Sequence, residues 1–194
     1  GVMSSCFALG FLEGKAGNIE EARRLYQKAC DGGAMGGCFS LGSLEKEAGN
    51  IAEARRLYQK ACDGGDMLGC YNLGVIEKEA GNIAEARRLY KKACDGGRMD
   101  GCFNLGHIEI EAGNIAEARP LCKKACDGGE MSGCSLLGLI EEEAGNISEA
   151  RRLCKKACDG GNMVGCFALG ILEEKAGNIA EGRRLWKKAC DGGV

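Results

Sequence analysis

Cysteine recurs along this chain every 32 residues, and this period constrains the fold more than any other feature of the sequence. One series comprises Cys6, Cys38, Cys70, Cys102, Cys134 and Cys166, and a second comprises Cys30, Cys62, Cys94, Cys126, Cys158 and Cys190. Such periods are typical of stacked repeats, which bury a continuous core between neighbours. We therefore expect residues 1–194 to form a single array with units of roughly 3–34, 35–66, 67–98, 99–130, 131–162 and 163–194.

Each unit has the pattern of a helical hairpin. In the second unit, residues 35–48 carry apolar side chains at helical spacing, and Gly49 ends this predicted helix. A second helix is expected from Ile51 to about Asp63. Asn50 and Glu53 predict a capping box at its start. The sequence thus predicts an all-α fold, a right-handed α-α solenoid of six 32-residue hairpins.

Two further local features are predicted on the second helices. Glu53 and Arg56 are three residues apart, which favours an ion pair on the helix surface. In the fourth unit Pro120 replaces the second arginine of the Arg-Arg pair. Because proline removes a backbone donor inside a helix, at a cost of roughly 3 kcal/mol, we expect a kink there.

The register of Leu41-Gly42, Gly49, Ala54, Tyr58 and Ala61 resembles the tetratricopeptide repeat. The segment 60–74, with two cysteines eight residues apart, resembles still more closely the Sel1-like, cysteine-rich repeat proteins of the Helicobacter type. This resemblance implies disulfides between cysteines eight apart and a scaffold that binds proteins. This chain departs from these families in two ways. Its repeat unit is shorter than a usual Sel1-like repeat, and Glu45 stands where both families commonly have an aromatic residue.

Each cysteine pair spans the Gly-Gly link between two units, where a tight turn would bring the Cα atoms within the roughly 7 Å that a disulfide needs. We predict the bridges Cys30–Cys38, Cys62–Cys70, Cys94–Cys102, Cys126–Cys134 and Cys158–Cys166. The alternative is that all of these cysteines are reduced and buried. Cys122 and Cys154 occupy the slot of Tyr26, Tyr58, Tyr90 and Trp186, and are expected to be buried free thiols. Metal binding at their two C-x3-C steps would compete with the disulfides.

Charge and cysteine content limit the class of protein. The 26 basic and 28 acidic residues alternate along the chain, which gives no nucleic-acid footprint. The apolar runs are short and interrupted, so no membrane insertion is expected. The sequence has no signal-peptide pattern, which is consistent with a leader that was removed or with a fragment. Paired cysteines favour a secreted, periplasmic or other oxidising compartment.

No catalytic constellation emerges. His107 is the only histidine, and Ser43 matches an S-x-x-K step without the S-D-N and K-T-G motifs of penicillin-interacting enzymes. The run Glu141-Glu142-Glu143 recurs in similar form in every unit and is interpreted as a solvated face. We therefore predict a protein that is not an enzyme and needs no cofactor or metal. A weak β-lactam-binding protein or hydrolase is kept as an alternative, because the cysteine-rich relatives have been linked to that activity.

The positions that vary most among units lie on one face of the first helices. One variable column contains Ser132 and Val164, and an aromatic column is broken only by Ser135. By resemblance to tetratricopeptide arrays, this face would line a groove that holds peptides. The candidate groove residues are Phe7, Phe11, Phe39, Ser43, Tyr71, Val75, Phe103, His107, Leu139, Phe167 and Ile171. Alternatively, the variation marks unselected surface and the aromatic residues belong to the core.

The two ends of the array suggest a second surface. The first unit carries ordinary apolar residues rather than a polar cap, and so does the last. Head-to-tail stacking of copies would cover both ends and place Cys190 beside Cys6, and repeated contacts of this type produce filaments. We predict a non-catalytic protein-binding scaffold that self-associates in this way. A monomeric groove adaptor is the main alternative. Asn146 lies in a glycosylation sequon, and its modification is left open.

Overall fold

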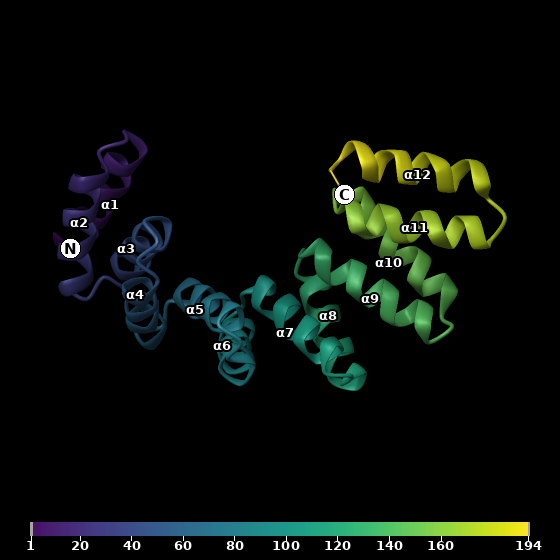
Figure 1. The fold of residues 1–194 in the computed structure, drawn as a ribbon, viewed down its shortest axis with the longest axis horizontal. Helices are drawn as coiled ribbons and strands as arrows, with labels where there is room; N and C mark the ends of the chain where they lie inside the picture. The colour runs from purple at the N-terminus through teal and green to yellow at the C-terminus, as the bar shows by residue number, and fades with distance from the viewer. Residues whose placement is uncertain (1, 194) are drawn as a thin grey trace. The chain divides into compact units, whose positions relative to one another are not determined.

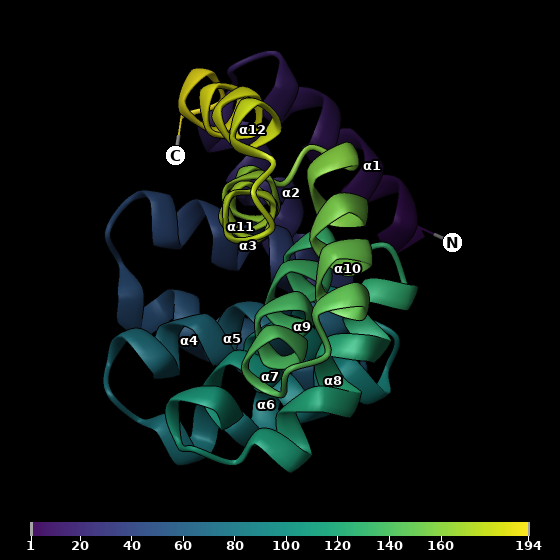
Figure 2. The same cartoon turned by 90° about the vertical axis from the view of Figure 1, so that its right-hand side faces the viewer.

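A computed structural model describes residues 2–193, and all regular secondary structure in this range is α-helical. The helices are α1 (Val2–Lys15), α2 (Ile19–Asp31), α3 (Met35–Glu47), α4 (Ile51–Asp63), α5 (Met67–Glu79), α6 (Ile83–Asp95), α7 (Met99–Glu111), α8 (Ile115–Asp127), α9 (Met131–Glu143), α10 (Ile147–Asp159), α11 (Met163–Lys175) and α12 (Ile179–Asp191). They form six hairpins packed as a solenoid, so the predicted fold class is confirmed. Figures 1 and 2 both show α11 and α12 side by side.

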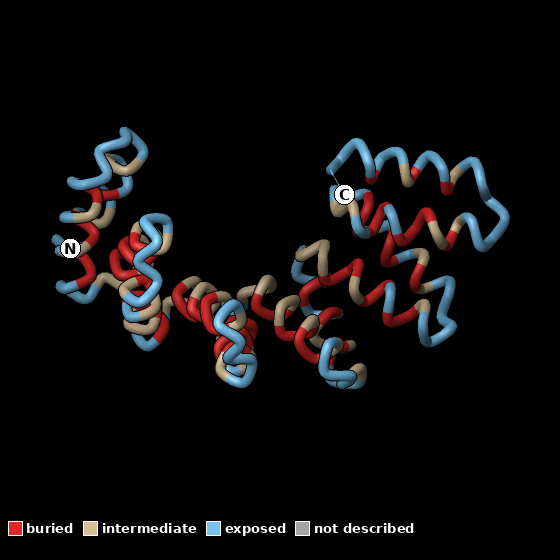
Figure 3. The backbone as a smooth tube through the Cα atoms, viewed as in Figure 1, coloured by how far each residue is buried: buried red, intermediate tan, exposed pale blue. Residues whose placement is uncertain are grey.

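The chain divides into two compact units, residues 1–98 and 99–194. In each unit the second helix of one hairpin packs against the first helix of the next. The residues that face neighbouring helices are buried, whereas the hairpin loops are exposed (Figure 3). In the first unit, for example, Ala54, Tyr58 and Leu73 belong to one core cluster. The core therefore continues from hairpin to hairpin within each unit, as stacked repeats require.

Each hairpin turns through a glycine in the left-handed region of backbone conformation. Gly49 has a φ of 81°, which glycine adopts without a steric penalty. The Asn50 N–H donates to the Glu45 carbonyl (2.8 Å), and the Gly49 N–H donates to the Lys46 carbonyl (3.0 Å). These two bonds form a Schellman motif, which satisfies the last carbonyls of α3. The Ala-Gly-Asn link thus ends one helix and starts the next within three residues.

The predicted capping box is wrong. Asn50 precedes α4, but its side chain makes no cap hydrogen bond. Instead, Asn50 Nδ2 donates to Glu45 Oε2 (2.7 Å), because the Glu45 carboxylate is buried and requires partners. Glu53 accepts from Arg56 Nε (2.9 Å), which confirms the predicted pair three residues apart.

The interpretation of the acidic runs as a solvated face is also wrong for the first glutamate of four runs, because Glu45, Glu77, Glu109 and Glu141 are buried. Glu77 is 6% exposed and lies 3.1 Å from Arg55 Nε of the preceding hairpin. It also accepts from Asn82 Nδ2 (2.7 Å). Equivalent interhairpin pairs join Arg23 to Glu45, Arg119 to Glu141, and Arg151 to Glu173. At the position where related families commonly have an aromatic residue, this chain therefore has a carboxylate that links neighbouring repeats through a paired charge.

Disulfides join consecutive hairpins. The bonds Cys30–Cys38, Cys62–Cys70 and Cys126–Cys134 each have a Cα–Cα distance of 4.5 Å, and that of Cys158–Cys166 is 4.4 Å. Cys94 and Cys102 are also disulfide-bonded. The solenoid is therefore stapled at the links between hairpins, as the fold prediction states. The disulfides indicate an oxidising compartment.

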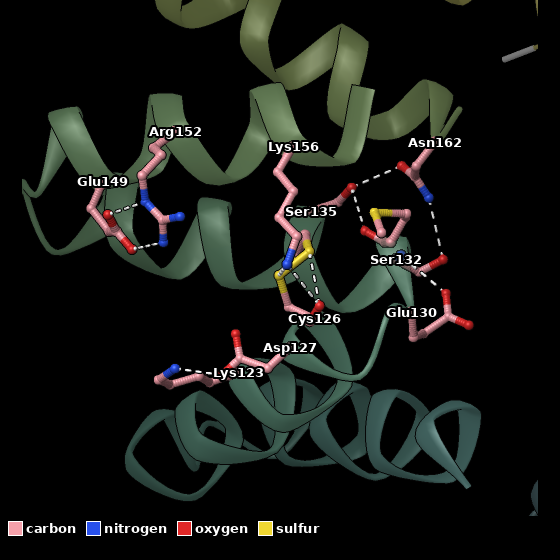
Figure 4. The surroundings of a disulfide bond; sticks show 12 residues. Lys123, Cys126, Asp127, Glu130, Ser132, Ser135, Glu149, Arg152, Lys156 and Asn162 are labelled. Atoms are coloured by element: carbon pink, nitrogen blue, oxygen red, sulfur yellow. Dashed lines mark hydrogen bonds and ion pairs between the residues drawn. A yellow bond between two sulfur atoms is a disulfide. The ribbon is translucent and has the colours of Figure 1, made fainter. Parts of the chain in front are cut away.

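A lysine from the following hairpin contacts some of these staples. Lys156 Nζ donates to the Cys126 carbonyl (3.0 Å) and lies 3.6 Å from its sulfur (Figure 4). Lys92 and Lys188 donate in the same way to the carbonyls of Cys62 (2.9 Å) and Cys158 (3.0 Å). These carbonyls lie in the last turn of a helix, where a cation is favourable.

Pro120 lies inside α8, which extends from Ile115 to Asp127 across it. The helix thus continues past the proline, and the kink remains a prediction. Among the described residues, no helix combines the length and apolar character needed to cross a membrane.

Candidate functional site

A pocket of about 270 Å³ opens on the first-helix face of residues 99–194. It is lined by Phe103, His107, Ser132, Ser135, Leu136, Asn162 and Val164. These residues come from α7, α9 and α11, together with the residue that precedes α11. The pocket therefore spans three consecutive repeats of this unit, on the face where sequence variation among repeats is greatest.

The pocket lies where the aromatic column is interrupted. In residues 1–98 each aromatic-column residue packs on the tyrosine of its own hairpin. The ring centroids of Phe39 and Tyr58, for example, are 5.8 Å apart. In α9 the column residue is Ser135, and the tyrosine slot of the same hairpin holds Cys154. Two rings are thus replaced by two small side chains. We attribute the pocket to this loss of volume, because packed interiors otherwise leave few voids.

A polar network holds one side of the pocket in place. Ser135 Oγ donates to Asn162 Oδ1 (2.8 Å), and Asn162 Nδ2 donates to Ser132 Oγ (3.2 Å). In Figure 4 dashed lines join Asn162 to both serines. Asn162 Oδ1 also accepts from the Gly165 N–H (2.8 Å), so the same side chain caps α11. These bonds fix Asn162 before any ligand arrives.

The other side of the pocket is aromatic and apolar. The rings of Phe103 and His107 have centroids 6.3 Å apart. The His107 side chain is 38% exposed, and its Nδ1 lies 3.5 Å from Glu111 Oε2. Val164 is 45% exposed at the rim. The pocket therefore combines apolar walls with a few fixed polar atoms, the composition that is typical of ligand sites.

The other predicted groove residues lie in two settings. Phe7, Phe39 and Tyr71 are partly buried and pack on the core of residues 1–98, so the core interpretation describes them in part. Ser43, Val75 and Ile171 are also partly buried. By contrast, Phe11, Leu139 and Phe167 are 48%, 36% and 50% exposed.

Sequence reasoning missed five lining residues as candidates. Ser132 and Val164 belong to a variable column, and Ser135 interrupts the aromatic column, so these departures from the repeat were the available signal. Asn162 also lies at a variable position, where the preceding repeats have Ala34, Asp66, Arg98 and Glu130, but it precedes the first helix of its hairpin and so fell outside the helical face from which candidates were chosen. Leu136 likewise falls outside the predicted set.

The hydrogen-bond partners of Ser43 are a backbone carbonyl and a tyrosine hydroxyl, whereas a nucleophilic serine is bonded to a general base. The Ser43 hydroxyl donates to the Phe39 carbonyl (3.1 Å) and accepts from the Tyr58 hydroxyl (3.1 Å). The first of these bonds is the common return of a mid-helix serine to the preceding turn. Over residues 2–193, no group of three or more His, Cys, Asp or Glu side chains is arranged to hold a metal ion.

Cys122 and Cys154 are free and buried, as predicted from their position, which holds Tyr26, Tyr58, Tyr90 and Trp186 in the other repeats. Burial raises the pKa of each thiol from 9.0 to about 11, and the charge of Glu142 adds to the effect at Cys154. Folding therefore favours the protonated thiols. Their contribution to stability is complete below pH 9 and is lost as the pH rises through about 11.

We expect thiol reactivity to separate the free cysteines into classes. At pH 8 Cys190, which is exposed, will react rapidly with Ellman's reagent, and Cys6, which is partly buried, more slowly. Cys122 and Cys154 will react only when denaturant unfolds the chain, because at a pKa near 11 only about one thiol in a thousand is ionised. Mass spectrometry of the labelled peptides measures the order. Rapid labelling of Cys122 in the native protein would contradict this expectation.

Comparisons with known proteins agree with the repeat architecture. The Sel1 repeat family model matches residues 4–33, 132–162 and 165–194. Tetratricopeptide repeat models match residues 39–101 and 100–127. No curated protein matches the chain.

Solved structures show the same fold at low sequence identity. The protective antigen c5321 from uropathogenic Escherichia coli, described as an SLR fold, is 20% identical with a TM-score of 0.85 over 96% of this chain. The chain spans only 45% of that protein. A Sel1 repeat protein from Oxalobacter formigenes is 21% identical, with a TM-score of 0.82 over 96% of this chain and 84% of its own.

YrrB, a tetratricopeptide repeat protein described as having an unusual peptide-binding site, is 17% identical. Its TM-score is 0.60 over 87% of this chain and 92% of its own. The cysteine lattice, the helical hairpins and these matches lead to one conclusion. The chain is a repeat protein of the Sel1-like and tetratricopeptide-like type.

Proposed function

We propose that this protein is a non-catalytic scaffold that binds a protein or peptide on its first-helix face, in an oxidising, extracytoplasmic compartment. The observation that carries the proposal is the pocket at Ser135, which is open, largely apolar and bordered by fixed polar atoms. Scaffolds of this family generally bind other proteins, and YrrB is described as having a peptide-binding site. The disulfides support the compartment, and secretion or a periplasmic location would both supply it.

The chemistry of the pocket defines the expected anchor. Phe103, Leu136 and Val164 provide apolar contact, which favours a large aliphatic or aromatic side chain. The hydroxyl and amide groups of Ser132 and Asn162 lie on the same wall, where they can bond the backbone of an extended segment. Because Asn162 is already held by three hydrogen bonds, little side-chain entropy is lost when a ligand binds.

The substitution Ser135→Phe tests this site. A phenylalanine restores the aromatic column found at Phe103 and Phe167, so the variant is expected to fold while its ring fills the pocket. We expect peptides selected by the wild-type protein from a displayed random library to contain a large apolar residue. Their affinity for Ser135→Phe, measured by fluorescence anisotropy, will fall at least about tenfold, since one buried apolar side chain contributes about 1.5–3 kcal/mol.

Ser148→Phe is the matched control. Ser148 is an exposed serine in the first turn of α10, outside the pocket, so this variant adds the same ring without filling the site. It will bind the selected peptides as the wild type does. The proposal fails if the library yields no enriched peptide, or if Ser135→Phe and Ser148→Phe bind equally well.

Head-to-tail association of copies is the second candidate. Leu9 and Leu12 of α1 are 45% and 61% exposed, whereas their equivalents Leu73 and Ile76 are 1% and 2% exposed beneath the preceding hairpin. Cys6 and Cys190 are free. An exposed apolar face favours association of copies.

A further inference from the structure

A glycine is required wherever one hairpin stacks on the next within a unit. Gly69 precedes the bridged Cys70, and a Cβ atom added to it would lie 2.7 Å from Ala61 Cβ, 2.9 Å from the Cys62 backbone nitrogen and 3.0 Å from the Tyr58 carbonyl oxygen. Carbon atoms in ordinary contact are about 3.5–4.0 Å apart. Two of these three obstacles are backbone atoms, which cannot turn aside as the end of a flexible side chain can.

The same requirement recurs at each described stacking contact. The distance from the added Cβ atom to the facing alanine is 2.7 Å at Gly37, 2.6 Å at Gly133 and 2.5 Å at Gly165. The backbone nitrogen of the facing cysteine lies 2.9 Å, 2.9 Å and 3.0 Å away, respectively. The contact is thus a property of the repeat and does not depend on the variable residues around it.

The first hairpin departs from this rule. Its residue before Cys6 is Ser5, where all later repeats have glycine. Ser5 is exposed and lies on α1 next to a cysteine that has no disulfide. A second copy that stacked α12 on α1 in the repeat geometry would press Ala189 and the Cys190 backbone against the Ser5 Cβ atom.

We infer that Ser5 prevents copies of this chain from stacking end to end in the repeat geometry, and so keeps Cys6 and Cys190 of different copies from forming a disulfide. Head-to-tail association, the second candidate function, would therefore require a geometry other than that of the repeat, although the exposed leucines of α1 favour contact. The obstruction depends on a single carbon atom. Removing that atom opens the face to a second copy.

Three substitutions test this inference. Ser5→Gly removes the Cβ atom, and we expect copies to associate about tenfold to a hundredfold more tightly than the wild type, as relief of an overpacked contact implies. Ser5→Ala keeps the Cβ atom and loses only the hydroxyl, so it will remain as monomeric as the wild type. Ser4→Gly is the matched control for added helix flexibility, because Ser4 is the neighbouring exposed serine.

Light scattering of the full chain measures the mass, and non-reducing electrophoresis after air oxidation detects bridged copies. Ser5→Gly will give a ladder that collapses with reductant and that disappears when Cys190→Ser is added. Circular dichroism checks that each variant is folded. The inference is overturned if the wild type forms the Cys6–Cys190 ladder as readily as Ser5→Gly, if Ser5→Ala associates as Ser5→Gly does, or if folded Ser5→Gly stays monomeric.

Discussion

Replacing Cys62 and Cys70 together with alanine is expected to lower the free energy of unfolding by about 2.5 kcal/mol in the chain-entropy model for so short a loop. Both side chains are at most 1% exposed, and Ala is close to Cys in size and apolar character, so most of the loss comes from the larger freedom of the unfolded chain. Urea unfolding of the oxidised protein, followed by circular dichroism, measures the change. Reduction of every staple should have a far larger effect, comparable with the 5–15 kcal/mol that stabilises a whole domain.

The control for this experiment is Cys6→Ser, which changes a free, partly buried cysteine in the same lattice position. It should leave the free energy of unfolding within about 0.5 kcal/mol of the wild type. Equal stability of the Cys62→Ala, Cys70→Ala double variant and the wild type would show that the staples do not stabilise the array.

Gly69→Ala is expected to destabilise the protein by about 3 kcal/mol, at the upper end for overpacking. The added methyl group would lie 2.7 Å from Ala61 Cβ and 2.9 Å from the Cys62 nitrogen, so α4 and α5 must separate. Because the strained contact lies beside the Cys62–Cys70 bond, we also expect slower closure of that disulfide during oxidative refolding. Urea unfolding and peptide mapping of the refolded protein measure the two effects.

Gly14→Ala is the same substitution at a site with room. Its added methyl group would lie 3.7 Å from Ala22 Cβ, an ordinary contact, in the last turn of α1. We expect no loss and a gain of up to about 1 kcal/mol from helix propensity. If Gly69→Ala proved as stable as Gly14→Ala, the stacking contact would tolerate a side chain. The role inferred for Ser5 would then be untenable as well.

The repeat period and the helix bounds were accessible from the sequence. The expected helix from Ile51 to about Asp63 matches α4, and the first helix, expected over 35–48, extends over Met35–Glu47. Apolar spacing and glycine at the links suffice for this, because they act within a few residues of the chain. The bridging of Cys62 to Cys70 was accessible for the same reason, since the tight link alone brings the two close together.

The role of Glu45 was not accessible in this way. The sequence predicts that Glu45 begins a solvated acidic run, close to a helix cap at Asn50. In the structure Glu45 is 7% exposed and accepts a hydrogen bond from the Asn50 side chain, which makes no cap bond to α4. The preceding hairpin covers it and supplies Arg23, and a partner from another repeat is invisible to a pattern read along one helix.

The sequence by itself determined the unit, its two helices and the staples, because each depends on contacts between residues near one another in the chain. Only the tertiary structure decided where a pocket lies and which end face can be covered. The pocket at Ser135 depends on the volume missing from one hairpin and on the walls that its two neighbours supply, and the obstruction at Ser5 depends on a 2.5–2.7 Å approach seen at the equivalent glycines. Both are distances between helices, and these are set by how side chains fill the space between hairpins.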